Sequence, residues 1–520
     1  MIFRAIGLNT VILLQLKEQI KPCLPMLRHQ RLLTLCLALL LGALLAYTSY
    51  RAATLSMTHD ESASYNWFRD TNIFTCFYSK DCWYNANNHL LNTWGWQQST
   101  RLLGVSEWTV RLPNLLAHLL YLLCTLAVVR SVANRFWVGL VGFAFINFNP
   151  YLLEFFGLAR GYGLVAGLSM ASMCALFVFL RNNRWPALLA SYLLAALAAL
   201  ANFVALNYLA SLWGAVFLLS LFRQGTSPGR IGFQWRRQLW MNAIPLGISI
   251  ILAALLYRPI RFLPETGDFD SYGTSSFAAA FRSVVENSLY GVNYFGENTI
   301  SAFTLLYAVA VIPALVGAFW FFFRAPEQNW RQQYLATALL FLLSSIVMTV
   351  QHHVLGSNYL EGRKALLFIS LSGLLFFFLL HGLAEMYFRP RLADVLAALF
   401  AVLAVYHLAR AGNLDYSREW WYDKNTREMI LYLNTIVPPE NAPVELGVAD
   451  MFQPTTSFYQ QAWEVKVFTP PFYSSEIHTD GRFDFYYVFD SQIPLLEEKY
   501  EVEKRFTGGQ SLLRKRDKIW

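Results

Sequence analysis

The chain has 520 residues, of which 56% are hydrophobic and only 14% are charged, a balance that excludes an ordinary soluble protein. A formal net charge of +8 at pH 7 could serve nucleic-acid binding, but the basic residues lie mostly in alternate loops between apolar runs. That is the positive-inside pattern, whereas a nucleic-acid surface would cluster them. Six cysteines in this length exclude a disulfide framework. Composition therefore predicts a polytopic membrane protein whose partner is the lipid bilayer and not nucleic acid.

Repeated apolar runs of about 17–22 residues are long enough to cross a bilayer as helices. They predict about eleven spans, at residues 32–50, 112–129, 136–153, 161–180, 185–201, 203–222, 239–257, 302–323, 334–354, 365–384 and 392–410. Every loop assigned to the inside carries arginine, so residues 1–31 are expected in the cytoplasm and the C-terminus outside. The long segment before the first run, with no small-x-small site after it, indicates a retained signal-anchor.

The segment between the first two spans, residues 51–111, is too long for a simple connector, and such loops are usually functional or disordered. Its four tryptophans favour an ordered structure. It begins with Thr58-His59-Asp60-Glu61, which places two adjacent carboxylates just past the first span. Cys76 and Cys82 lie in the same loop, and we expect either a disulfide between them, in an oxidising compartment, or two free thiols.

The composition becomes that of a soluble protein from residue 412 onward. Residues 423–436 alternate like an amphipathic helix, and residues 444–448, 483–489 and 500–505 are typical of short strands. Residues 412–520 therefore predict a small α/β domain on the outer side, large enough for its own core. The expected fold is a mainly α membrane protein, with a membrane domain at 32–411, a large first outer loop and this C-terminal domain.

The charged residues on the outer side suggest chemistry on a lipid phosphate. Carboxylates such as Asp60 and Glu61, with ordinary pKa values near about 4, are ionised at neutral pH and can accept a proton from a hydroxyl. Arg160, Arg363 and Lys364 lie at outer helix mouths, against the positive-inside trend, and arginine matches phosphate in a bidentate way. The alternatives are a solvated helix end for the carboxylates and interface snorkelling for the basic residues.

Several motifs occur in a characteristic order. They are His59–Glu61, Asn87–Asn92, Ser106–Glu107 with Arg111–Pro113, Glu154–Gly163, Asn202–Leu206 and Gly362–Leu366. The ordered set, over about residues 30–410, resembles the polytopic GT-C glycosyltransferases, a superfamily that includes protein O-mannosyltransferases and the aminoarabinose transferase of lipid A.

This resemblance implies roles for ten residues. Asp60 would be the catalytic base, with Glu61 as its acidic partner and Glu154 as a second acidic residue. The substrate-binding residues would be His59, Asn88, His89, Arg160, Tyr162, Arg363 and Lys364, with Arg160 and Arg363 on the donor phosphate. The resemblance also implies a polyprenyl-phosphate sugar donor and inversion at the anomeric carbon. No metal-ligand spacing appears, so we expect no cofactor, with a divalent metal left open because some relatives use one.

Adjacent carboxylates rarely flank one bond, so the Asp60–Glu61 pair also favours a single displacement over the retaining route. The sequence thus predicts a glycosyltransferase on the outer face of a bacterial cytoplasmic membrane, acting on a lipid, glycan or protein acceptor. One alternative is a lipid-linked glycan transporter or flippase, which would need broken or ionisable helices at mid-membrane and inverted repeats. The other is a non-catalytic scaffold that presents the C-terminal domain to a partner.

Overall fold

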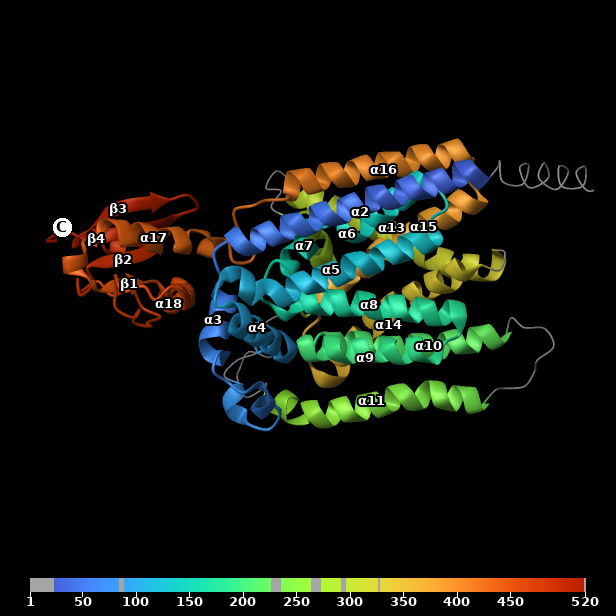
Figure 1. The fold of residues 1–520 in the computed structure, drawn as a ribbon, viewed down its shortest axis with the longest axis horizontal. Coiled ribbons are helices and arrows are strands. Elements are labelled where there is room, and N and C mark those ends of the chain that lie inside the picture. Colours follow the sequence, from blue (N-terminus) through green and yellow to red (C-terminus); the bar gives the residue numbers. More distant parts are fainter. Residues whose placement is uncertain are drawn as a thin grey trace, which may run out of the picture.

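Figure 1 shows the fold in a computed structural model, which describes residues 23–83, 88–225, 235–262, 273–290, 296–325 and 328–518. Most of the long helices run side by side, and the C-terminal domain lies beyond one end of them. The short helices of the first outer loop lie at that same end, where α3 is next to the C-terminal domain. Of the predicted cytoplasmic segment, residues 1–22 lie outside the described residues, and the remainder belongs to the first long helix.

The membrane part is built from long apolar helices. They are α2 (Cys23–Thr54), α5 (Glu107–Val132), α6 (Phe136–Asn147) with α7 (Pro150–Phe156), α8 (Gly161–Asn182), α9 (Trp185–Ala201), α10 (Ala205–Gly225), α11 (Trp235–Phe262), α13 (Glu297–Arg324), α14 (Asn329–Leu355), α15 (Leu366–Met386) and α16 (Pro390–Ala411), with the shorter α12 (Phe277–Ser288) and η4 (Gly362–Ala365) between them. Within the described ranges, nine are long and apolar enough to cross a membrane, or ten if α6 and α7 form one bent span. The chain is a multi-pass membrane protein.

Ten of the predicted spans each coincide with one of these helices and the eleventh coincides with α6 and α7 together, but the predicted count of eleven is not confirmed. The apolar α9 has only 17 residues, and the expected span at 136–153 is broken, with α6 and α7 meeting at 63°. The break follows from the sequence, because Pro150 has no N–H to continue α6 and suits the first turn of a new helix. The Asn149 side chain caps that turn by accepting from the Leu152 N–H at 3.0 Å.

The first outer loop is ordered over its described residues, as its tryptophans predict. It contains α3 (His59–Phe68), η1 (Ile73–Phe77), η2 (Lys80–Cys82) and α4 (Leu90–Leu103), and Cys76 and Cys82 form a disulfide. A capping box begins α3: the Thr58 side chain accepts from the Glu61 N–H, and the Glu61 carboxylate accepts from the Thr58 N–H. Such a box satisfies two free backbone donors at the start of a helix and so fixes where α3 begins.

The C-terminal domain has one four-stranded sheet in the order β1-β2-β4-β3. Its elements are η5 (Trp421–Asn425), α17 (Thr426–Ile436), η6 (Pro439–Asn441), β1 (Leu446–Val448), η7 (Asp450–Phe452), α18 (Gln453–Ala462), β2 (Phe485–Phe489), η8 (Asp490–Leu495), β3 (Tyr500–Phe506) and β4 (Gln510–Lys515). Strands β1 and β2 are parallel, and β4 pairs antiparallel with β2 and β3. The amphipathic helix and the three strands occur where the sequence predicts them, whereas α18 and β4 are additional.

The C-terminal domain packs directly on the first outer loop, through α18 against α3 (Figure 1). The Tyr459 hydroxyl accepts from the Met57 N–H at 2.9 Å and donates to Glu107 at 3.1 Å. Arg427 forms an ion pair with Glu107 at 3.4 Å. Because Glu107 begins α5 and Met57 precedes α3, these contacts join the domain to both ends of the loop that carries Asp60.

Candidate active site

A cavity of about 390 Å³ lies where residues of the first long loop meet the ends of membrane helices. Seven of the ten predicted site residues line it: Asp60, Asn88, His89, Arg160, Tyr162, Arg363 and Lys364. Its other walls are mostly apolar and include Leu200, Phe203, Val204, Leu206, Ile260, Leu355 and Leu360. Residues spread over about 300 positions of sequence thus share a site that is charged in one part and apolar in another.

Asp60 is the carboxylate of this cavity. It forms ion pairs with Arg160 Nη2 at 3.0 Å and with Arg363 Nη2 at 3.5 Å, and its side chain is 14% exposed. Burial alone would raise the pKa of Asp60, but the two guanidinium groups hold that pKa below its usual value. Asp60 is therefore ionised at neutral pH and sits between two cations at the cavity wall.

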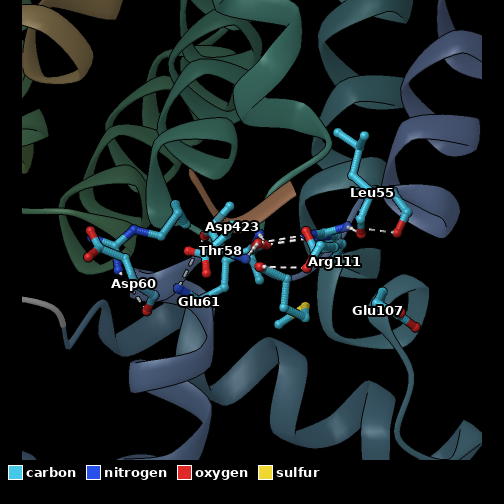
Figure 2. A network of polar contacts seen from close by, with 12 residues as sticks. Leu55, Thr58, Asp60, Glu61, Glu107, Arg111 and Asp423 are labelled. Carbon is cyan, nitrogen blue, oxygen red and sulfur yellow. Dashed lines mark hydrogen bonds and ion pairs between the residues drawn. The ribbon is translucent and has the colours of Figure 1, made fainter. Parts of the chain in front are cut away.

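Glu61 faces different surroundings, although it is the next residue (Figure 2). Its carboxylate accepts from Arg111 Nε at 2.9 Å and Arg111 Nη2 at 2.7 Å, and neither side chain is exposed. The remaining N–H groups of Arg111 donate to the carbonyl oxygens of Ala52, Leu55 and Ser56. All the donors of this guanidinium are thus satisfied, which a buried charge requires. Burial would raise the pKa of Glu61, but Arg111 holds it below its usual value.

The position of Arg160 is set by the peptide that precedes it. The Ala159 N–H donates to Glu61 at 2.5 Å, and the Ala159 carbonyl accepts from Asn92 Nδ2 at 2.9 Å. Asn92 in turn accepts from Asn114 Nδ2 at 2.7 Å. A Cβ on Gly161 would collide with the carbonyl oxygen of Ala201, so glycine is needed there for close approach. Three motif residues, Glu61, Asn92 and Gly161, therefore act together to position Arg160.

Two predicted site residues besides Glu61 do not line the cavity. Glu154 is buried on α7, where it accepts from the Arg418 N–H at 2.7 Å and lies 3.8 Å from Arg51. The His59 ring contacts the C-terminal domain through the Met451 carbonyl oxygen, 2.9 Å from Nδ1. The catalytic and substrate-binding roles expected of Glu154 and His59 stay predictions.

Asn88 and His89 lie on the same wall but are held differently. Asn88 Nδ2 donates to the Cys82 carbonyl at 3.1 Å and its Oδ1 accepts from Thr93 at 3.2 Å, so this amide supports the disulfide-bonded turn. His89 stands edge-on to Tyr162, with ring centroids 5.6 Å apart. Burial, together with the nearby cations, lowers the pKa of His89 well below its usual value, so the ring is neutral.

The C-terminal domain supplies residues that the sequence does not single out. Glu419 forms an ion pair with Arg363 and accepts a hydrogen bond from the Tyr151 hydroxyl. The Trp420 ring lies 5.0 Å from the Arg363 guanidinium and 6.0 Å from that of Arg160. Two aromatic residues, Trp420 and Trp421, follow Glu419 at the start of the C-terminal domain, but this pair does not indicate the contact with Arg363. Both arginines are therefore oriented from two sides, by Asp60 and by this segment.

Metal binding can be assessed only for the described part of the chain. No group of three or more His, Cys, Asp or Glu side chains there has an arrangement that could hold a metal ion. The expectation of no cofactor stays a prediction.

A scan against protein-family models gives no match, and a search of curated proteins gives none either. Solved structures do match. ArnT from Cupriavidus metallidurans bound to undecaprenyl phosphate aligns over 92% of this chain and 97% of its own, with a TM-score of 0.50 at 13% identity. The chain has the fold of ArnT. The predicted resemblance to GT-C proteins is thereby confirmed at the level of the fold.

Two other structures align over most of this chain. The oligosaccharyltransferase of Archaeoglobus fulgidus, in complex with Zn and sulfate, aligns over 93% of this chain and 73% of its own length, with a TM-score of 0.45 at 11% identity. The arabinofuranosyltransferase AftD from Mycobacteria aligns over 92% of this chain and 39% of its own length, with a TM-score of 0.43 at 14% identity.

Proposed function

We propose that the chain is an inverting membrane glycosyltransferase that transfers a sugar from a polyprenyl-phosphate donor to an envelope acceptor. The observation that carries the proposal is the cavity in which ionised Asp60 lies within 3.5 Å of two guanidinium groups and beside apolar walls. This combination suits a ligand with a phosphate head and a hydrocarbon tail. The fold shared with ArnT, whose structure was solved with undecaprenyl phosphate bound, supports the same class of donor.

In this proposal the donor phosphate binds Arg160 and Arg363, with Lys364 nearby, and the polyprenyl chain follows the apolar wall. A phosphate matches the planar guanidinium fork at least as well as a carboxylate does, so its entry releases Asp60 from its two ion pairs. The released carboxylate is then an acceptor for a hydroxyl proton. Donor binding and activation of the base are in this way linked through the same two arginines.

The reaction that follows is a single displacement. Asp60 removes the proton from an acceptor hydroxyl, and that oxygen forms a bond to the anomeric carbon from the face opposite the phosphate. The bond between the anomeric carbon and the phosphate oxygen breaks, and the electron pair leaves with the polyprenyl phosphate. Arg160 and Arg363 stabilise the charge that develops on this leaving group. Glu61 acts as a positioning residue in this scheme, because its carboxylate holds Arg111 and the Ala159 peptide.

We further propose that the site faces the outer side of a bacterial cytoplasmic membrane. The arginine-containing loops are expected in the cytoplasm, and the cavity lies at the opposite ends of the helices, next to the C-terminal domain. The C-terminal domain completes the site through Glu419 and Trp420, which a scaffold that merely presents the domain to a partner would not need.

The test is sugar transfer by the purified protein in detergent. A panel of polyprenyl-phosphate sugars is offered with crude envelope acceptors, using wild type, Asp60→Asn and the control Asp70→Asn, whose carboxylate is 90% exposed and forms an ion pair with the neighbouring Arg69. Transfer by wild type and the control, with none by Asp60→Asn, is the expected result. A fully active Asp60→Asn protein contradicts the assignment. If no donor reacts but labelled lipid-linked sugar crosses vesicles, the chain is a flippase.

A further inference from the structure

Two aromatic rings lie close to the guanidinium groups that line the cavity. The centroid of the Trp420 ring is 5.0 Å from Cζ of Arg363 and 6.0 Å from Cζ of Arg160. The centroid of the Tyr162 ring is 6.0 Å from Cζ of Arg363. A cation that lies over an aromatic ring at such a distance is attracted by its π electrons, and tryptophan gives the strongest attraction. Both arginines therefore have an aromatic partner in Trp420 as well as a carboxylate partner in Asp60.

The position of the Trp420 ring is fixed by contacts with both parts of the protein. The residue is only 4% exposed. Its N–H donates to the Ser417 carbonyl at 3.2 Å, and its carbonyl accepts from the Asp423 N–H at 3.1 Å, so a compact turn of the C-terminal domain holds its backbone. Its ring meets that of Phe155, on α7, edge-on, with centroids 6.4 Å apart. Trp420 is therefore held from the membrane domain as well as from its own.

A phosphate would affect the carboxylate partners and the aromatic partners of the arginines differently. Asp60 and Glu419 pair with N–H groups of these guanidinium groups, and phosphate oxygens compete for the same donors. An aromatic ring attracts the cation through its π electrons and carries no acceptor oxygen or negative charge for the phosphate to replace. The aromatic contacts can therefore persist when a phosphate takes the place of the carboxylates.

We propose that Trp420 is a positioning residue that acts through Arg160 and Arg363 and keeps both guanidinium groups in place for the donor phosphate after the carboxylates have been displaced. The inference rests on the proposed function and gives the C-terminal domain a part in donor binding. Side chains that are already held in the binding geometry lose less conformational freedom when the ligand enters, which strengthens binding.

The chain offers a matched control in the next residue. Trp421 carries the same side chain in the same turn, but it is 46% exposed. The rings beside it are those of Tyr422 and Phe489 of the C-terminal domain, with centroids 6.2 and 6.4 Å away. Replacing Trp421 therefore tests the loss of an indole from this turn.

The test measures binding of undecaprenyl phosphate to the full-length protein in detergent. The variants are Trp420→Phe and Trp420→Leu, with Trp421→Leu as the control. Trp420→Leu should weaken binding about tenfold because two cation–π contacts are lost, and Trp420→Phe, which keeps a weaker π face, should weaken it about threefold. Trp421→Leu should leave binding as in wild type.

A second series separates the π electrons of Trp420 from the shape of its side chain. Tryptophan with one, two or three fluorine atoms is incorporated at position 420 alone, because fluorine withdraws electrons from the ring and changes its size little. The dissociation constant should rise with each added fluorine, whereas the same series at position 421 should leave it unchanged. A residue that only fills space would not show this dependence. The fluorinated side chains keep the size of tryptophan, so the series decides the question even if Trp420→Leu does not fold.

Three results overturn the inference while leaving the proposed function intact. Folded Trp420→Leu binds undecaprenyl phosphate like wild type, Trp421→Leu weakens binding as much as Trp420→Leu does, or fluorination at position 420 has no effect. A wild-type protein that binds no polyprenyl phosphate at all overturns the proposed function, and the inference falls with it.

Discussion

Removing the charge of Asp60 and removing that of the adjacent Glu61 should have different main effects, the first on transfer activity and the second on the stability of the fold. We expect Glu61→Gln to destabilise the fold strongly, whereas Asp60→Asn should cost less stability and abolish transfer. The reason lies in their partners, because Glu61 is enclosed with Arg111, whereas Asp60 borders a cavity. A matched pair of isosteric substitutions therefore separates a positioning residue from a catalytic one.

The size of the effect can be worked from the contacts of Glu61. Each carboxylate oxygen takes two donors: Oε1 from Arg111 Nε at 2.9 Å and the Ala159 N–H at 2.5 Å, Oε2 from Arg111 Nη2 at 2.7 Å and the Thr58 N–H at 3.0 Å. Glutamine keeps only one acceptor oxygen and turns its NH₂ toward two donors. Neither side chain of the pair is exposed, and breaking a buried ion pair costs about 3–5 kcal/mol. Asp60 is 14% exposed and borders a cavity, so the loss of its charge should cost less than that of Glu61, about 1–3 kcal/mol.

The assay is unfolding of the purified protein in mixed detergent and SDS micelles, compared with transfer activity under native conditions. Arg111→Met and the Glu61→Gln/Arg111→Met double variant complete a double-mutant cycle. Because the two side chains form one buried pair, the double variant should lose about 2 kcal/mol less than the sum of the single losses. The reasoning is refuted if Glu61→Gln unfolds within about 1 kcal/mol of wild type, or if Asp60→Asn is destabilised as much as Glu61→Gln.

Three further predictions concern pH, the C-terminal domain and the disulfide. In the free protein, Arg160 and Arg363 hold the Asp60 pKa below its usual value near about 4. The base is therefore ionised above that pH, and kcat/KM for the donor, which reports the free protein, should fall only as the pH drops below about 4. A rate profile with its acid limb near pH 6.5 would contradict Asp60 as the base. Glu419→Gln should tighten binding of undecaprenyl phosphate several-fold, since Arg363 loses a competing carboxylate; weaker binding in titrations would mean that Glu419 instead positions the arginine. Replacing both Cys76 and Cys82 by serine should cost about 2 kcal/mol of stability, from the entropy of a short closed loop, with transfer retained; unchanged gel mobility and no new alkylation after reduction of wild type would show that no disulfide forms.

Much of the membrane part could be predicted because its signals are local. A run of about 20 apolar residues predicts a helix wherever it occurs, since a bilayer leaves few other structures available. The broken span at residues 136–156 is the instructive exception. Its hydropathy is continuous, and only Asn149-Pro150, an N-cap residue followed by proline, marks where α6 ends and α7 begins. The same two residues therefore explain why α7 turns and carries Glu154 to a buried position near Arg51.

The parts that could not be predicted depend on contacts between distant segments. The pairing of Glu419 with Arg363 joins the C-terminal domain to the mouth of α15, and no local pattern at residue 419 indicates that partner. Strand β4 is different, because Gly508 and Gly509, both at positive φ, mark the hairpin turn that precedes it. Strand β4 could therefore have been predicted from its turn residues, whereas the contact between the C-terminal domain and the site could not.

Asp60 and Glu61 face different partners because of where α3 begins. Successive residues of a helix point about 100° apart, so adjacent carboxylates cannot both face one cavity from the same helix. The sequence Thr58-His59-Asp60-Glu61 is itself a capping-box pattern, a Thr followed three residues later by Glu, which directs Glu61 back toward the Thr58 N–H. Arg111, which donates to Glu61 and to the carbonyls just before α3, then fixes this turn (Figure 2). Asp60 is left to face Arg160 and Arg363, so the residue that anchors the turn also determines which carboxylate can act as the base.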